Sequence, residues 1–211
     1  MNITKNTLRT NIKKELCQFF DSEKNKDFLD NNACNIFLNS DLYKKTSIIL
    51  AYISIKKELS VDKIIKTALL QGKQVAVPKT NVEKQTMTFH LLNNNFPLEK
   101  QLKKGNYNIL EPLDSLSEFP IKNMQTNTVI LTPGLAFSKN GARLGRGKGF
   151  YDKFFEQSLF YNPLIYSTFH LVGCCYDIQI KDFIPTEKND IKVTNIITPS
   201  NIIFVKKMKK K

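Results

Sequence analysis

The residues best suited to chemistry lie between positions 134 and 152 of this 211-residue chain. Five of the eight glycines and two of the three arginines fall in this stretch. Glycine lets a backbone turn with positive φ and bring its N–H groups close to a ligand. The arginine guanidinium binds phosphate or carboxylate oxygens through two bonds at once, and Lys148 adds a further positive charge. The combination predicts an anion site, and phosphate is the anion that it fits best.

A strand and a helix are expected on either side of this stretch. Residues 128–131 are a short apolar run rich in β-branched side chains, which is typical of a buried strand. Aromatic and leucine side chains then recur at helical spacing over residues 149–159, which predicts a helix. A strand, a glycine-rich loop and a helix in this order point a helix N-terminus at a bound phosphate.

The familiar phosphate motifs do not fit this stretch. A P-loop needs glycine where Ala142 stands and serine or threonine where Gly149 stands. The dinucleotide pattern G-x-G-x-x-G fails at Phe150 when it is started from Gly145. Composition alone therefore leaves open a flexible nucleic-acid-binding segment or a plain hairpin loop.

Longer motifs identify a family. The run PGLAF at residues 133–137 and the run RLGRGKGFYD at residues 143–152 resemble the signature of the 5-formyltetrahydrofolate cyclo-ligase family. Lys5 and Arg9 are similar to the family's N-terminal K-x-x-L-R element, and residues 105–112 resemble its aromatic-x-I-x-E-P turn. The ending Q…P-x-E-x-x-D is matched up to Asp190, so the resemblance runs from about Lys5 to Thr198.

The resemblance implies an ATP-driven cyclisation of 5-formyltetrahydrofolate to 5,10-methenyltetrahydrofolate, with ADP and phosphate released. Phosphorylation turns the amide-like formyl oxygen into a good leaving group, and N10 then attacks the activated carbon. Such a phosphoryl transfer depends on positioning and on neutralisation of charge. Arg146 and Lys148 are therefore the candidate catalytic residues. The ATP-binding residues that the resemblance implies are Lys5, Arg9, Arg143, Leu144, Gly145, Arg146, Gly147, Lys148, Gly149, Phe150 and Tyr151.

The resemblance also implies a folate subsite and a magnesium ion. Ile53 would pack on the substrate, Glu58 would hydrogen-bond the pterin, and Tyr107 would stack on the pterin ring. Glu58 has a structural alternative, which is to cap the end of a strand. A single tyrosine such as Tyr107 usually only packs against other side chains. Asp152 and Asp190 supply the hard oxygen ligands that suit Mg²⁺. Phe150 stands where the family commonly has tyrosine, which leaves the role of that hydroxyl open.

Alternating apolar runs and amphipathic segments predict a three-layer α/β/α fold with a mainly parallel sheet. The resemblance implies the sheet topology shared with phosphosugar isomerases and coenzyme A transferases. The glycine-rich loop is then expected at the carboxyl ends of the strands. Residues 1–205 form one expected domain, and the basic residues 206–211 form an expected disordered tail. Helices are expected at 6–20, 22–38, 61–69 and 149–159, and strands at 47–53, 74–78, 86–92, 128–131, 164–176 and 195–198.

Composition limits the remaining function classes. No apolar run reaches the ~18 residues of a membrane helix, and the N-terminus lacks the apolar core of a secretory signal. The adjacent Cys174 and Cys175 lie in an apolar run and are expected to be buried thiols in a reduced, cytoplasmic protein; a mitochondrial presequence stays open. A monomer is expected.

The net charge of +13 comes mostly from scattered lysines, which indicates a solvated surface and not a nucleic-acid-binding stripe. The competing class is nevertheless a nucleic-acid-binding module that uses the RGRGKG run and the basic tail. It leaves the acids Glu58, Asp152 and Asp190 unexplained. A third class is a related ATP-dependent enzyme that acts on another folate or amide.

Overall fold

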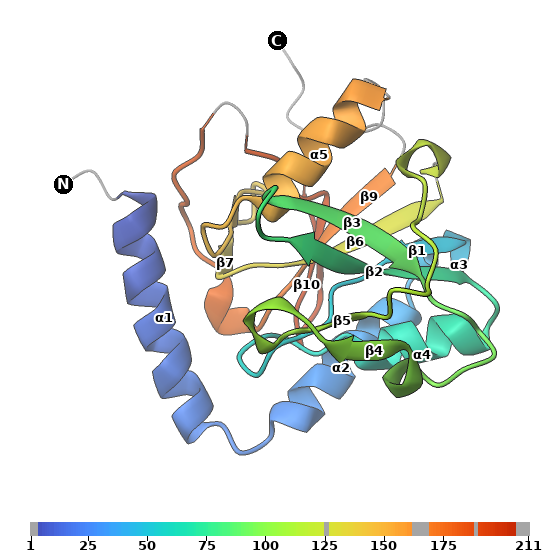
Figure 1. The fold of residues 1–211 in the computed structure, drawn as a ribbon. Helices are drawn as coiled ribbons and strands as arrows, with labels where there is room; N and C mark the ends of the chain where they lie inside the picture. Colours follow the sequence, from blue (N-terminus) through green and yellow to red (C-terminus); the bar gives the residue numbers. More distant parts are fainter. Residues whose placement is uncertain (1–3, 125–126, 162–168, 188–189, 206–211) are drawn as a thin grey trace, which may run out of the picture.

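A seven-stranded sheet organises the computed structural model, which describes residues 4–124, 127–161, 169–187 and 190–205. The expected tail, residues 206–211, lies outside the described residues. The strand order is β11-β10-β9-β6-β1-β2-β3 (Figure 1). The strands are β1 (Ile48–Leu50), β2 (Gln74–Asn81), β3 (Thr86–Leu91), β6 (Thr128–Pro133), β9 (Phe169–Cys174), β10 (Asn195–Ile197) and β11 (Ile202–Phe204).

The middle of this sheet is parallel and its edges are antiparallel. β1 pairs in parallel with β2 and β6, and β9 pairs in parallel with β6 and β10. β3 and β11 close the two edges as antiparallel strands on β2 and β10. The predicted mainly parallel sheet is therefore confirmed, and the strand expected at residues 86–92 is the antiparallel edge strand β3.

Helices cover both faces of the sheet. The helices α2 (Lys26–Leu38), α3 (Asp41–Lys45) and α4 (Asp62–Leu70) share one core cluster with every second strand residue, such as Ile49. Helix α5 (Phe150–Tyr161) packs on the other face in a cluster with the alternate residues, such as Leu50. Because successive strand residues point to opposite faces, one buried strand supplies both cores. These are the three predicted layers.

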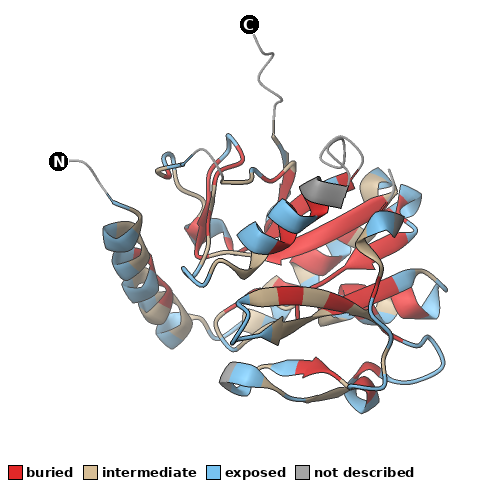
Figure 2. Ribbon diagram, turned by 45° about the horizontal axis from the view of Figure 1, so that its top comes forward, coloured by how far each residue is buried: buried red, intermediate tan, exposed pale blue. Residues whose placement is uncertain are grey.

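Helix α1 (Lys5–Ser22) lies outside these layers, on the left of the molecule in Figure 1. The side chain of Thr4 caps it by accepting a hydrogen bond from the Thr7 backbone N–H. Ile12 and Leu16 pack against the hairpin of β7 (Ala136–Phe137) and β8 (Arg143–Leu144). The rest of the helix surface is largely exposed (Figure 2). Helix α1 is thereby fixed beside the glycine-rich loop that follows β8.

Several predicted boundaries differ from the observed ones. The strand expected at residues 47–53 ends at Leu50, because only the Ala51 backbone N–H still bonds to β2, at the Ala76 carbonyl, before the chain leaves the sheet. The helix expected to begin at residue 22 begins at Lys26, because Ser22 still belongs to α1. The strand expected at 164–176 is observed as β9, which ends two residues earlier than expected, at Cys174; residues 162–168 lie outside the described residues.

Short elements that the sequence did not indicate complete the fold. The 3₁₀ turn η1 (Leu98–Gln101) precedes β4 (Leu102–Lys104), and the 3₁₀ turn η2 (Asn106–Asn108) connects β4 to its partner β5 (Leu110–Pro112). Further 3₁₀ turns are η3 (Ile121–Asn123) and η5 (Asp177–Gln179). In the described part of the chain, no helix has the length and apolar character needed to span a membrane. Cys174 and Cys175 are buried free thiols, as predicted.

Candidate active site

A cavity of about 1280 Å³ opens where β1, β2 and β6 end. Four segments that are distant in sequence form most of its wall: the start of α1, the segment after β1, the stretch from β8 into α5, and residues 185–187 with Asp190. The carboxyl ends of neighbouring parallel strands meet at one edge of a sheet, so loops from several strands can share a site there. This is the predicted position of the glycine-rich loop.

The cavity brings together the predicted site residues. Its lining includes the residues expected to bind ATP, the two expected to hold the metal, and the folate residues Ile53 and Glu58. The side chain of Tyr107 lies outside the described residues, although its backbone belongs to η2 and its neighbour Asn108 lines the cavity. Shared location does not test the individual roles, which stay predictions.

Residues 143–149, here called the phosphate loop, have the backbone that their glycines predicted. Gly147 has φ of +95° and Gly149 has φ of +73°, a region in which a side chain is strained. The carbonyl of Gly145 accepts a hydrogen bond from Arg9 Nε at 3.0 Å, which ties the loop to α1. Arg146 and Lys148 are exposed at the cavity. The loop thus presents cations and backbone at the start of α5.

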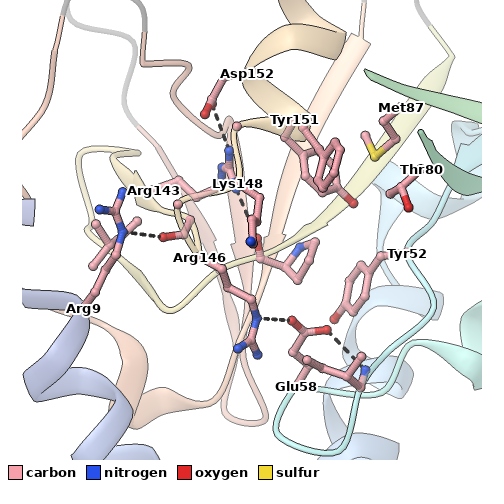
Figure 3. A pocket seen from close by; sticks show the side chains of 18 of the residues that line it. Arg9, Tyr52, Glu58, Thr80, Met87, Arg143, Arg146, Lys148, Tyr151 and Asp152 are labelled. Atoms are coloured by element: carbon pink, nitrogen blue, oxygen red, sulfur yellow. Dashed lines mark hydrogen bonds and ion pairs between the residues drawn. The ribbon is translucent and has the colours of Figure 1, made fainter. Parts of the chain in front are cut away.

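Three cations assigned to phosphate are paired with carboxylates assigned to other tasks. Arg143 Nη2 lies 3.2 Å from Asp152 Oδ1, and Arg146 Nε lies 2.9 Å from Glu58 Oε1 (Figure 3).

Lys5 Nζ lies 2.6 Å from Asp190 Oδ2 and 3.0 Å from Glu187 Oε1. The three pairs make the cavity a surface of mixed sign, not a uniformly basic one. A nucleic acid backbone favours a surface of one sign, so this arrangement suits a small charged ligand better.

Burial and pairing fix the charge states of two cavity residues. Partial burial lowers the pKa of Lys5, but the hydrogen bonds to Asp190 and Glu187 outweigh it and raise that pKa above its ordinary value. Burial raises the pKa of Tyr151 well above its ordinary value despite the opposing effect of nearby Arg143. Lys5 therefore stays charged and Tyr151 stays neutral near pH 7. The Arg143 guanidinium also lies 5.3 Å from the centre of the Tyr151 ring.

The opposite wall of the cavity is the segment 52–60, here called the Glu58 segment. Glu58 is only 8% exposed, and its Oε2 accepts a hydrogen bond from the Ile55 backbone N–H at 3.3 Å. The Tyr52 hydroxyl donates to the Leu59 carbonyl at 2.5 Å. The buried segment has no strand or helix, so side chains satisfy the backbone groups that a ladder would otherwise pair.

A second tyrosine supports the same wall. The Tyr176 hydroxyl donates to Asp30 Oδ1 at 2.5 Å and makes a longer contact of 3.3 Å with the Glu58 carbonyl. Asp30 is held in turn by Lys26 at 2.5 Å. We did not predict these residues from the sequence. A signal was present, since Tyr176 follows directly on an apolar strand, where a buried hydroxyl needs a partner.

The residues expected to hold Mg²⁺ fit an ion that arrives with a nucleotide. Asp152 and Asp190 both line the cavity, and Mg²⁺ takes one or two protein carboxylates beside water and phosphate oxygens. Among the described residues there is no cluster of three or more histidine, cysteine, aspartate or glutamate side chains suited to a metal. Both carboxylates are paired with cations, so metal and phosphate would have to rearrange these pairs together.

Comparisons with known proteins agree with this geometry. A model of the 5-formyltetrahydrofolate cyclo-ligase family matches residues 2–199. The chain is 30% identical over 169 residues to a 5-formyltetrahydrofolate cyclo-ligase of Saccharomyces cerevisiae, covering 71% of this chain and 74% of the yeast protein. It is 27% identical over 201 residues to that of Mus musculus, covering 93% and 94% of the two chains.

Solved structures show a similar fold. The NMR structure of the Aquifex aeolicus 5,10-methenyltetrahydrofolate synthetase superposes with a TM-score of 0.75 at 23% sequence identity, covering 99% of this chain and 96% of that one. A 5,10-methenyltetrahydrofolate synthetase of Mycoplasma pneumoniae gives a TM-score of 0.65 at 22% identity, covering 93% and 99%.

Proposed function

Because this chain belongs to the 5-formyltetrahydrofolate cyclo-ligase family, we propose that it converts 5-formyltetrahydrofolate to 5,10-methenyltetrahydrofolate at the expense of ATP. One observation carries the proposal: the phosphate loop and the buried carboxylate of Glu58 face each other across a single cavity. A reaction that phosphorylates a folate needs both recognition elements within reach of the same formyl group.

The chemistry proceeds in two displacements. The formyl oxygen attacks the γ-phosphorus of ATP, the bond from that phosphorus to its bridging oxygen breaks, and ADP leaves. N10 of the folate then attacks the activated formyl carbon, the carbon–oxygen bond breaks to release phosphate, and N10 loses its proton. Both steps spread negative charge over phosphate oxygens, so fixed positive charge lowers their barriers.

The residues divide into three tasks. Arg146 and Lys148 neutralise charge on the transferring phosphoryl group, since both are exposed to the cavity on the phosphate loop. Glu58 accepts hydrogen bonds from the pterin, Ile53 packs on the folate, and Tyr107 is assigned to stack on the pterin ring. The remaining cations, together with the backbone N–H groups of the phosphate loop, hold the ATP phosphates.

Mg²⁺ would be held by Asp152 and Asp190 together with the nucleotide. When bound, it would neutralise phosphate charge and orient the γ-phosphoryl group. The two aspartates would contribute hard oxygen ligands from two different parts of the chain, Asp152 from the first turn of α5 and Asp190 from the C-terminal segment.

The same proposal covers the setting of the reaction. A single domain of residues 1–205 carries it, as a monomer in the cytoplasm with reduced folate and ATP as small-molecule partners. No nucleic acid takes part, because the cations of the cavity face carboxylates that a phosphodiester backbone would have to displace.

An absorbance assay for methenyltetrahydrofolate tests the proposal. Product should form from 5-formyltetrahydrofolate only when ATP is present, and omission of Mg²⁺ should reduce the rate. Lys148→Ala should abolish most of the signal, while Lys139→Ala should not, since Lys139 is exposed in the same stretch but does not line the cavity. Product formation without ATP, or no product from the folded protein, would contradict it.

A further inference from the structure

The ion pair between Glu58 and Arg146 joins the two halves of the cavity. Arg146 Nε donates to Glu58 Oε1 at 2.9 Å across 88 positions of sequence, and Figure 3 shows the contact between the two walls. The family resemblance assigns Glu58 to the folate and Arg146 to the phosphates. In the structure, each of these side chains holds the other.

The two partners differ in their freedom to move. Glu58 lies on the buried segment whose backbone is held by Tyr52 and Tyr176, and its side chain is 9% exposed. Arg146 has a side chain that is 39% exposed, and it stands between two glycines. When the pair opens, Arg146 is therefore the partner that moves, and Glu58 stays as a buried carboxylate in need of another donor.

We propose that Glu58 is also a positioning residue for Arg146, and that it makes folate and nucleotide binding cooperative. This inference rests on the proposed function. A pterin bound to Glu58 supplies N–H donors to the carboxylate and releases Arg146 toward the ATP phosphates. Without folate, a nucleotide that draws Arg146 away leaves a buried carboxylate without its cation, which is costly.

The coupling has a defined sign. Each ligand should tighten the other, and by the same factor, because linkage between two binding sites is reciprocal. We expect a factor of about five or more, within the usual range of such couplings. If the pterin and Arg146 instead share the carboxylate in the ternary complex, the factor is one.

Replacement of Glu58 by glutamine separates the possible roles. Glu58→Gln keeps the size of the side chain but removes the charge that holds Arg146. With folate absent, the variant should bind a nucleotide more tightly than the wild type. A residue that only contacts folate would leave nucleotide affinity unchanged, and a residue that only supports the wall would weaken both ligands.

The removal of any negative charge near phosphates strengthens their binding, so a matched control is needed. Glu111 lines the same cavity and is 5% exposed, but its Oε1 accepts hydrogen bonds from the backbone N–H and the hydroxyl of Thr80, whereas Arg146 pairs with Glu58. Glu111→Gln removes one charge and keeps the Glu58–Arg146 pair. Its effect on nucleotide affinity measures the general electrostatic contribution.

The experiment is calorimetric titration of Mg²⁺ and a non-hydrolysable ATP analogue into the full chain, with and without saturating 5-formyltetrahydrofolate. The wild type and Glu111→Gln should show the coupling, and Glu58→Gln should bind the analogue more tightly than Glu111→Gln and lose the coupling. A wild type without coupling, or equal gains in both variants, would overturn the inference alone. A wild type that binds neither ligand would overturn the proposed function as well.

Discussion

The two walls of the cavity differ in how their backbones are held in place. The Glu58 segment follows β1 of the central sheet, whereas the phosphate loop runs from β8 of the separate hairpin to α5. Both ends of the Glu58 segment are buried, at residues 52–53 and 58–59, and tyrosine hydroxyls hold two of its carbonyls. The phosphate loop is exposed at residues 146–148, and it has left-handed glycines and ion pairs with carboxylates of other segments.

The difference fits the ligands that we propose for the two walls. The pyrimidine half of a reduced pterin is flat and rigid, so a carboxylate held in one place by buried hydrogen bonds can select it. A phosphoryl group changes its geometry and charge during transfer, so its cations must be able to shift from resting partners to the reacting oxygens. The structure thus places a fixed wall against an adjustable one.

The largest effect on turnover should follow from removal of the cations of the phosphate loop. Arg146→Ala and Lys148→Ala should each lower turnover by about 10²-fold or more, because a charge clamp on the transferring phosphoryl group is lost. Thermal unfolding should change little, since both side chains are exposed. Steady-state kinetics with Lys139→Ala as the control checks this, and unchanged turnover in both variants would remove the loop from the chemistry.

Weakening the support of the Glu58 segment should affect the KM for folate and not the KM for ATP. Tyr52→Phe leaves the buried Leu59 carbonyl without its donor, which should cost about 1–3 kcal/mol of stability and raise the KM for folate several-fold with little change in the KM for ATP. Tyr43→Phe is the matched control, because the Tyr43 hydroxyl bonds to Gln71 at 2.7 Å and does not line the cavity. If both variants raise the folate KM equally, Tyr52 only stabilises the fold.

A glycine substitution should distort the adjustable wall more mildly. Gly147→Ala forces a side chain into φ of +95°, and the added carbon would lie 3.5 Å from the Arg9 guanidinium. We expect a stability loss of about 1 kcal/mol and weaker nucleotide binding. Gly72→Ala has φ of +73° with open space around it, at the end of α4, and serves as the control for strain alone. Equal nucleotide affinity in the two variants would show that the backbone of the loop is not critical.

The sequence was most informative where structure is local. Apolar runs predicted the central strands, helical periodicity predicted the long helices, and the clustered glycines predicted left-handed backbone at the phosphate loop. The short helix α3 was not predicted, because its five residues are too few to show a helical period. The strands β7 and β8 were not predicted either, because two residues each are too few to show an alternating pattern.

The site was predictable as a set of residues but not as a set of contacts. The resemblance named Glu58 and Arg146, yet nothing in their types indicated that two side chains 88 positions apart would pair. The support of the Glu58 segment by Tyr176 and Asp30 spans 146 positions, and it depends on how the strands are ordered in the sheet. Contacts of this kind follow from topology, which local patterns do not encode.

The smallest expected effect concerns Asp190. Its carboxylate already accepts two hydrogen bonds from Lys5, at 2.9 and 2.6 Å, and one from the Glu187 backbone N–H at 2.6 Å. A metal ligand at this position must therefore exchange Lys5 for the ion when the nucleotide arrives. Asp190→Asn lowers the charge available to Mg²⁺ but keeps an oxygen donor, so the Mg²⁺ requirement of the reaction should rise by only a few-fold.

Folate binding without nucleotide separates the metal role of Asp190 from a structural one. It should be nearly unchanged in Asp190→Asn, because the hydrogen-bond partners of Asp190 among the described residues are Lys5 and Glu187, which lie outside the Glu58 segment. Asp182→Asn removes an exposed charge eight positions earlier and should leave both quantities as they are. A titration of Mg²⁺ at fixed ATP gives the answer. Wild-type Mg²⁺ dependence in Asp190→Asn would mean that this carboxylate holds Lys5 on the adjustable wall, and that Asp152 and the nucleotide suffice for the metal.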